Sequence, residues 1–171
     1  FVIKWGVLVL FLLFVFFSFS QKIYLTNADL GRHIKNGEIF FEKKIIIDTN
    51  YYSYTNPDFP TINHHWLIGP IFYVLYKLFG FWGLSLFYVL GAVVCYVFIF
   101  LTAKKESNFW LAILFCLLTV PLFSTRTEIR PEIFSYFFIS AYLYFLNRFK
   151  GIKVNFKLFA LFLLIQIFWV N

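Results

Sequence analysis

The sequence predicts an all-α, polytopic membrane protein with about five transmembrane helices and a large first extracytoplasmic loop that carries amphipathic interfacial helices. Composition is the first observation behind this prediction. Hydrophobic residues make up 61% of the chain and charged residues 13%, with a mean hydropathy of +0.79, whereas ordinary soluble domains are about one quarter charged. The second observation is that apolar runs approaching the ~20 residues of a membrane-spanning helix recur along the chain. The third is a long polar segment, residues 21–65, that interrupts these runs.

We expect a single transmembrane domain over residues 1–171. A signal peptide is the alternative for the first apolar run, but no small-residue cleavage site follows it, so a retained helix is favoured. Because the chain contains no Met, starts at Phe1 and stops at the end of an apolar run, we expect it to be the N-terminal part of a longer module. The predicted spans are residues 5–20, 83–102, 108–124, 132–147 and 157–170, with an outer loop over residues 21–82.

Residues 66–79 are apolar but short for a span, and Lys77 interrupts them. If this segment lies in the outer interface, the basic loops all fall on one side, where Glu106 is the only acid. That is the positive-inside pattern, and it would be broken if residues 66–79 crossed the membrane. We therefore predict an interfacial amphipathic helix here. The cytoplasmic side then carries Lys4, Lys104, Lys105, Arg148, Lys150, Lys153 and Lys157.

The outer loop concentrates the groups that can perform chemistry. It holds all three histidines and five of the eight acidic residues of the chain. We predict a short helix over residues 29–41, capped by Asn27 or Asp29 and ending near Gly37. The segment 48–60 is expected to be extended and rich in turns. The five acidic residues are Asp29, Glu38, Glu42, Asp48 and Asp58.

Asp29 and His33 form the first candidate pair, because a spacing of four residues places both on one face of a helix. A carboxylate beside an imidazole can act as a general base with its orienting partner, or the two can ligate a metal. The alternative is a solvated polar face on a surface helix. Both interpretations stay open at this point.

His64 and His65 form the second candidate group, at the point where the loop returns to the interface. They can ligate a metal or donate hydrogen bonds to a phosphate. The alternative is an interfacial polar cluster that precedes the anchoring Trp66. Asp48 is a third candidate, with a turn-forming role as its alternative.

Arg126 and Arg130 lie in a short loop that is predicted to face outward, against the positive-inside bias. They are thus expected on the same side as the polar loop. Arginine is the preferred partner of phosphate because its guanidinium forms bidentate hydrogen bonds. The alternative is that both arginines pair within their own loop, with Glu128 and Glu132.

Four motifs contain most of these candidate residues, and their order along the chain resembles that of the GT-C superfamily of membrane glycosyltransferases. The resemblance is strongest to bacterial members of the protein-mannosyltransferase and lipid-A-aminoarabinosyltransferase type. The resemblance covers nearly the whole chain. One departure is His65, which stands where such proteins often have an acidic residue. The motifs are Asp29-Leu-Gly-Arg-His33-Ile-Lys-Asn-Gly37-Glu38, Asp48 followed by Ser53-Tyr54-Thr55, Asn63-His64-His65-Trp66-Leu67, and Arg130-Pro131-Glu132-Ile133-Phe134.

The resemblance implies an enzyme of the cytoplasmic membrane, part of the cell envelope machinery, with its site on the extracytoplasmic face. It would transfer a sugar from a polyprenyl-phosphate donor to a glycan, lipid or protein acceptor. Asp29 would be the general base, with Asp48 as the next candidate. Arg126 and Arg130 would stabilise the departing phosphate, and His33, His64 and His65 would bind substrate.

Two other functions stay open from the sequence. The first is a non-catalytic membrane transporter or assembly subunit for lipid-linked glycans. The second is an outer-face metal-binding protein built on Asp29, His33, His64 and His65. No cofactor follows from the sequence, because metal use differs within the superfamily, and a divalent cation is one option. The basic isoelectric point of about 9.4 comes mostly from the inner loops, so membrane lipids and not nucleic acid are the expected partners.

Overall fold

The computed structural model describes residues 2–20, 29–63, 65–125, 128–151 and 155–170, and these form an all-α fold. The described residues contain no strand, only one isolated antiparallel bridge between Thr49 and Pro60. The prediction of an all-α protein is therefore confirmed. The described part of the chain forms six helices: α1 (Val2–Phe19), α2 (Leu30–Lys43), α3 (Ile68–Glu106), α4 (Phe109–Ser124), α5 (Glu132–Arg148) and α6 (Phe156–Val170).

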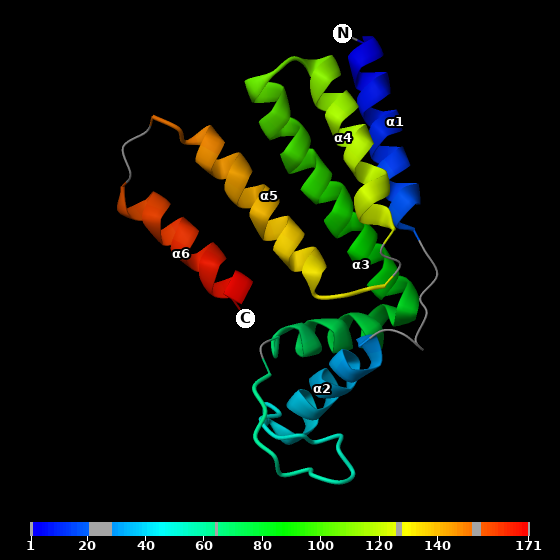
Figure 1. Cartoon of the computed structure of the whole chain (residues 1–171), viewed down its shortest axis with the longest axis vertical. Helices are drawn as coiled ribbons and strands as arrows, with labels where there is room; N and C mark the ends of the chain where they lie inside the picture. The colour runs from blue at the N-terminus through cyan, green and yellow to red at the C-terminus, as the bar shows by residue number, and fades with distance from the viewer. Residues whose placement is uncertain (1, 21–28, 64, 126–127, 152–154, 171) are drawn as a thin grey trace.

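The helices form two groups (Figure 1). The upper group contains α1, the long second part of α3, α4, α5 and α6, which run alternately down and up. The lower group contains α2 and the first part of α3, which lie across the foot of the upper group. Within the described residues, two helices, α1 and α3, are long and apolar enough to cross a membrane, while α4 and α6 are apolar but shorter.

Gly80 divides α3 into these two parts. Its backbone has φ 63° and ψ −159°, a conformation outside the helical region. Residues other than glycine rarely adopt a positive φ, because their Cβ collides with the backbone. The chain therefore changes direction at Gly80, between the segment predicted to be interfacial and the segment predicted to span.

The lower group is held by a close contact between two glycines. A Cβ placed on Gly37 would lie 2.1 Å from the carbonyl oxygen of Gly69 and 2.5 Å from Cβ of Tyr73. The helix predicted over residues 29–41 is present as α2. The prediction that it ends near Gly37 is wrong, because Gly37 lies inside α2 and allows α3 to approach. Instead α2 ends at Lys43. The next residue, Lys44, has φ 57°, and its N–H donates to the carbonyl of Phe40 at 3.1 Å.

The interior of the upper group is built from apolar and aromatic side chains of α1, α3 and α4. Phe11 of α1 meets Tyr96 of α3 edge to face, with ring centroids 6.0 Å apart. The Tyr96 hydroxyl lies 3.3 Å from that of Thr119 on α4, so its polar end is satisfied inside the helix group. Cys95 and Cys116 are free and buried, as expected for small interior residues.

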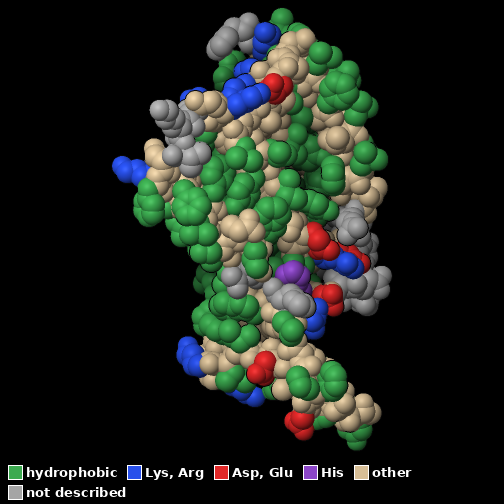
Figure 2. Space-filling view, turned by 60° about the vertical axis from the view of Figure 1, so that its left-hand side comes forward, with side chains coloured by type: hydrophobic (Ala, Val, Ile, Leu, Met, Phe, Trp, Pro, Cys, Tyr) green, Lys and Arg blue, Asp and Glu red, His purple; other side chains and the backbone are tan. Residues whose placement is uncertain are grey.

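Basic residues gather at the upper end of the helices, where α1 begins and α3 and α5 end (Figure 2). We call this the basic end. Asn147 links two of the helices there: its backbone oxygen accepts from Lys105, and its side-chain amide donates to Glu106 at 2.7 Å. The alternating helix directions thus place the predicted cytoplasmic charges together, apart from Lys153, which lies outside the described residues.

Candidate functional site

A cavity of about 370 Å³ lies at the opposite end of the helices from the basic end, between the upper and lower groups. Its walls come from α2, the start of α3, the start of α5 and the end of α6. Figure 2 shows a histidine between acidic and basic side chains on the surface near this junction. The polar residues that line the cavity are Asp29, Arg32, His33, His65, Arg130, Glu132 and Ser135.

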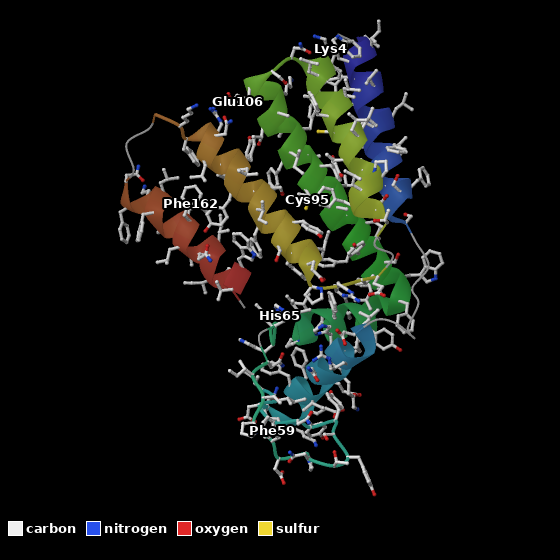
Figure 3. The ribbon with its side chains drawn as sticks, in the orientation of Figure 1. Lys4, Phe59, His65, Cys95, Glu106 and Phe162 are labelled. Atoms are coloured by element: carbon white, nitrogen blue, oxygen red, sulfur yellow. The ribbon has the colours of Figure 1, made fainter. Side chains whose placement is uncertain are left out.

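Four of the sequence-predicted site residues line this one cavity: Asp29, His33, His65 and Arg130. They come from three parts of the chain that are far apart in the sequence. Figure 3 shows His65 at the junction between the two helix groups. His64 and Arg126 lie outside the described residues, so the geometry assigns them no place.

Asp48 does not line the cavity. It belongs to the loop below α2, where its exposed side chain precedes the Thr49–Pro60 bridge and its carbonyl accepts from Thr61 N–H at 2.8 Å. Figure 3 shows this loop, marked by Phe59, at the far lower end of the molecule. Asp48 therefore lies apart from the other site candidates that the structure describes.

The start of α2 brings Asp29 and His33 together. Asp29 immediately precedes the helix, and its carbonyl accepts the His33 backbone N–H at 3.0 Å, as the first turn requires. The Asp29 carboxylate lies 3.5 Å from the guanidinium of Arg32, and both side chains are more than half exposed. Arg32 was not predicted as a site residue, although its spacing of three from Asp29 is a signal for such a pair.

His33 is the most deeply buried polar group of the site. Only 4% of it is exposed, and its ring meets Phe72 edge to face with centroids 6.1 Å apart. Its Nδ1 is buried and has no hydrogen-bond partner among the described residues. Burial lowers the pKa of His33 to about 4, and the charge of Arg32 adds to this while that of Asp29 opposes it. His33 is therefore a neutral imidazole at neutral pH.

Arg130 carries positive charge into the opposite wall of the cavity. Its guanidinium contacts the carboxylate of Glu128 and lies 3.9 Å from that of Glu132. The predicted alternative, pairing within the loop, thus describes its contacts here. Ion pairs with exposed partners contribute little stability, because water competes for both charges. Since 40% of the Arg130 side chain is exposed, an anionic ligand can reach it.

The remaining wall is apolar and comes from the facing ends of α5 and α6. Phe138 and Trp169 stack with their ring planes 25° apart and centroids 6.3 Å apart. The indole N–H of Trp169 donates to the hydroxyl of Ser135 at 3.3 Å, which fixes the ring against α5. The cavity is therefore polar toward α2 and apolar toward α6. A ligand that fills it must carry both kinds of surface.

A metal centre is not evident in the part of the chain that the structure describes: it contains no group of three or more His, Cys, Asp or Glu side chains arranged to hold an ion. The metal-binding prediction also used His64, which lies outside those residues. Comparison of the chain with protein-family models, with curated proteins and with solved structures gives no match.

Proposed function

We propose that this protein is a membrane glycosyltransferase of the GT-C type, which transfers a sugar from a polyprenyl-phosphate donor to an acceptor at the extracytoplasmic face of the cytoplasmic membrane. One observation carries the proposal: Asp29, His33, His65 and Arg130 line a single cavity at the end of a set of apolar helices. A lipid-linked sugar presents its head group at the membrane surface. The base and the cation that take part in sugar transfer must therefore lie at the membrane surface as well.

The proposal includes a membrane arrangement. In it, α1, the part of α3 after Gly80, α4, α5 and α6 are five spans, and α2 with residues 68–79 lies in the outer interface. The grouped lysines and arginines of the basic end support a cytoplasmic location for that end. The cavity then opens on the opposite, extracytoplasmic side.

In the proposed reaction Asp29 is the general base. Its carboxylate accepts the proton of an acceptor hydroxyl as that oxygen attacks the anomeric carbon of the sugar. The bond between this carbon and the phosphate oxygen breaks, and the polyprenyl phosphate leaves with the electron pair. Arg130 offsets the negative charge that grows on the phosphate, at the expense of its contacts with Glu128 and Glu132.

His33 has a binding role in this scheme. Because burial keeps its imidazole neutral, it can exchange a hydrogen bond with a sugar hydroxyl without adding charge beside Asp29. His65, which is exposed in the turn before α3, would contact the ligand from the outer side.

The test measures sugar transfer from a panel of polyprenyl-phosphate sugars by the protein in isolated membranes. Asp29→Asn removes the base and keeps the size of the side chain, so we expect transfer to fall by about 10²-fold or more, the usual contribution of a general base. Asp58→Asn is the matched control, because Asp58 is an exposed loop residue outside the cavity lining. Asp48→Asn should behave like this control.

Other outcomes would revise the proposal in defined ways. Transfer that survives Asp29→Asn but is lost in Asp48→Asn would move the base to the loop. Absence of transfer from every donor, with the protein folded and inserted, would favour the alternative of a non-catalytic transporter or assembly subunit. The pairing of Arg130 with two carboxylates is the observation that fits this alternative.

A further inference from the structure

The loop below α2 exposes two aromatic rings side by side (Figure 3). Its segment 50–56 contains three tyrosines among asparagine, serine and threonine. This composition is typical of recognition surfaces, because tyrosine offers a broad contact at a small cost in conformational entropy. Tyr51 and Tyr52 meet edge to face with ring centroids 5.4 Å apart, and 42% of Tyr51 and 49% of Tyr52 stay exposed. We call these two residues the tyrosine pair.

Two hydrogen bonds hold the tyrosine pair against α2. The hydroxyl of Tyr52 donates to the side-chain oxygen of Asn36, and the ammonium of Lys43 donates to the hydroxyl of Tyr51 at 3.0 Å. The same ammonium lies 5.4 Å from the centroid of the Tyr51 ring, within the range of a cation–π contact. The rings are therefore held in place before any ligand binds, which lowers the entropic cost of binding.

One face of α2 leads from the tyrosine pair to the cavity. Asp29, Arg32 and Asn36 are spaced by three and four residues, so they lie on the same side of the helix. Seven residues of helix cover about 10 Å, which is the distance along the axis from Asp29 to Asn36. Partial burial raises the pKa of Tyr52, and the charges of Lys35 and Arg32 act against this rise, which shows that both cations are near its phenol. We call this face, together with the tyrosine pair, the α2 track.

The charges along the α2 track are balanced. Arg32 lies 3.5 Å from Asp29, and Lys35 pairs with Glu38. A surface of paired charges, an amide and phenol rings does not select for an anion. It suits a neutral ligand with many hydroxyls, because the hydroxyls can bond to the polar groups while the C–H faces of the ligand lie on the rings.

A protein partner is a poorer fit to this surface. A stable protein interface buries about 800 Å² on each side, whereas the α2 track consists of one face of half a helix and two rings. An extended, narrow ligand matches its shape. Sugars linked in a chain are such ligands, and each unit carries both hydroxyls and apolar C–H faces.

We propose that the α2 track binds a chain of neutral sugars. This rests on the proposed function, in which the end unit of the chain is the acceptor and its hydroxyl lies beside Asp29. The following units pass Arg32 and reach the tyrosine pair. The acceptor is then a glycan, and its affinity depends on the length of its chain.

The test measures the binding of oligosaccharides of one to six units to the protein in lipid nanodiscs, by isothermal titration calorimetry. The probes are the glucose, mannose and N-acetylglucosamine series. We expect the affinity in at least one series to rise about tenfold once the chain is long enough to reach the tyrosine pair. Affinity that is independent of length in all three series, or absence of binding, would overturn the proposal.

The failure of this proposal can be told apart from failure of the proposed function. No donor is present in the titration, so binding is measured whether or not the protein transfers sugar. Length-dependent binding by a protein that transfers no sugar would support the α2 track and remove the proposed reaction. Sugar transfer without length-dependent binding would do the reverse.

Tyr52→Ala should lower the affinity for the longest bound chain about tenfold, equivalent to about 1.4 kcal/mol of binding free energy. Tyr52→Phe loses the bond to Asn36 but keeps the ring, so most of the affinity should remain. A loss in Tyr52→Phe as large as that in Tyr52→Ala would show that attachment of the loop, and not the ring, is what matters, and would overturn the proposal. Tyr54→Ala is the matched control, because the Tyr54 ring belongs to the same loop and is fully exposed. An equal loss in this control would also contradict the α2 track.

Discussion

Replacement of Gly37 by alanine is the sharpest test of how the lower helices are held. Its new Cβ would lie 2.1 Å from the Gly69 carbonyl oxygen and 2.5 Å from Cβ of Tyr73. The obstacles are the backbone of one neighbour and the first side-chain atom of the other, which cannot rotate away. The two helices must therefore separate by roughly 1 Å before van der Waals contact is restored.

The magnitude follows from two opposing effects. Overpacking of a close contact costs about 1–3 kcal/mol, and the backbone obstacle here argues for the upper part of that range. Alanine in place of glycine inside a helix gains about 1 kcal/mol of helix propensity. We expect Gly37→Ala to destabilise the docking of α2 on α3 by about 1–2 kcal/mol after both effects are counted.

Gly31→Ala is the matched control, because Gly31 lies in the same helix and an added Cβ meets nothing within 4 Å. It should stabilise α2 by about 0.5–1 kcal/mol through propensity alone. The assay is hydrogen exchange of the α2 amides, with the protein in lipid nanodiscs. Protection should fall about tenfold in Gly37→Ala and rise in Gly31→Ala. A change of the same sign in both variants would refute the close contact.

Two further predictions concern pH and the break in α3. Burial lowers the pKa of His33 from 6.5 to about 4. The free energy of α2 docking should therefore be largest above pH 6.5 and should fall by up to about 3 kcal/mol as the pH falls from 6.5 to 4. The measurement is hydrogen exchange of the α2 amides at each pH, corrected for intrinsic exchange rates. In His33→Gln this pH dependence should be absent. Gly80→Ala forces an L-residue to φ 63° and should lower the free energy of unfolding, measured by thermal unfolding, by about 1–2 kcal/mol. Gly6→Ala is the control, because a Cβ there meets nothing within 4 Å, and it should cause no such loss of stability. Equal effects at the two glycines would contradict the assigned break.

The helices of the upper group could be predicted closely from the sequence. The predicted segment 108–124 is α4 to within one residue at its start, and 132–147 and 157–170 match α5 and α6 similarly. Apolar runs bounded by charges, Asn and Pro mark helix ends without any knowledge of packing. A separation between the segments 66–79 and 83–102 was also predicted, because residues 66–79 are short for a span. The structure places the change of direction at Gly80.

The packing of α2 could not be predicted in the same way. Gly37 reads as a helix end, since glycine usually stops a helix. Its actual role depends on Gly69, which lies far along the chain and leaves no local signal. The close contact between the backbones of α2 and α3 can be identified only when the positions of both helices in space are known.

The site was predictable in part. The spacing of Asp29 and His33 and the predicted outward position of Arg130 led to residues that line one cavity. The apolar wall was missed, because Phe138 and Trp169 look like any other aromatic residues in apolar runs. Their place at the cavity depends on how α6 packs on α5, which hydropathy does not encode. Asp48 was included because of the resemblance, in which it precedes Ser53-Tyr54-Thr55, and the structure places it in the distant loop.

The central claim is that the cavity beside Asp29 is a site of sugar transfer. The most direct measurement is the rate of transfer from polyprenyl-phosphate sugars in membranes that contain either Asp29→Asn or Asp58→Asn. The account predicts a rate for Asp29→Asn that is lower by about 10²-fold or more, with the control equal to the unmodified protein. Equal rates in the two variants would contradict it.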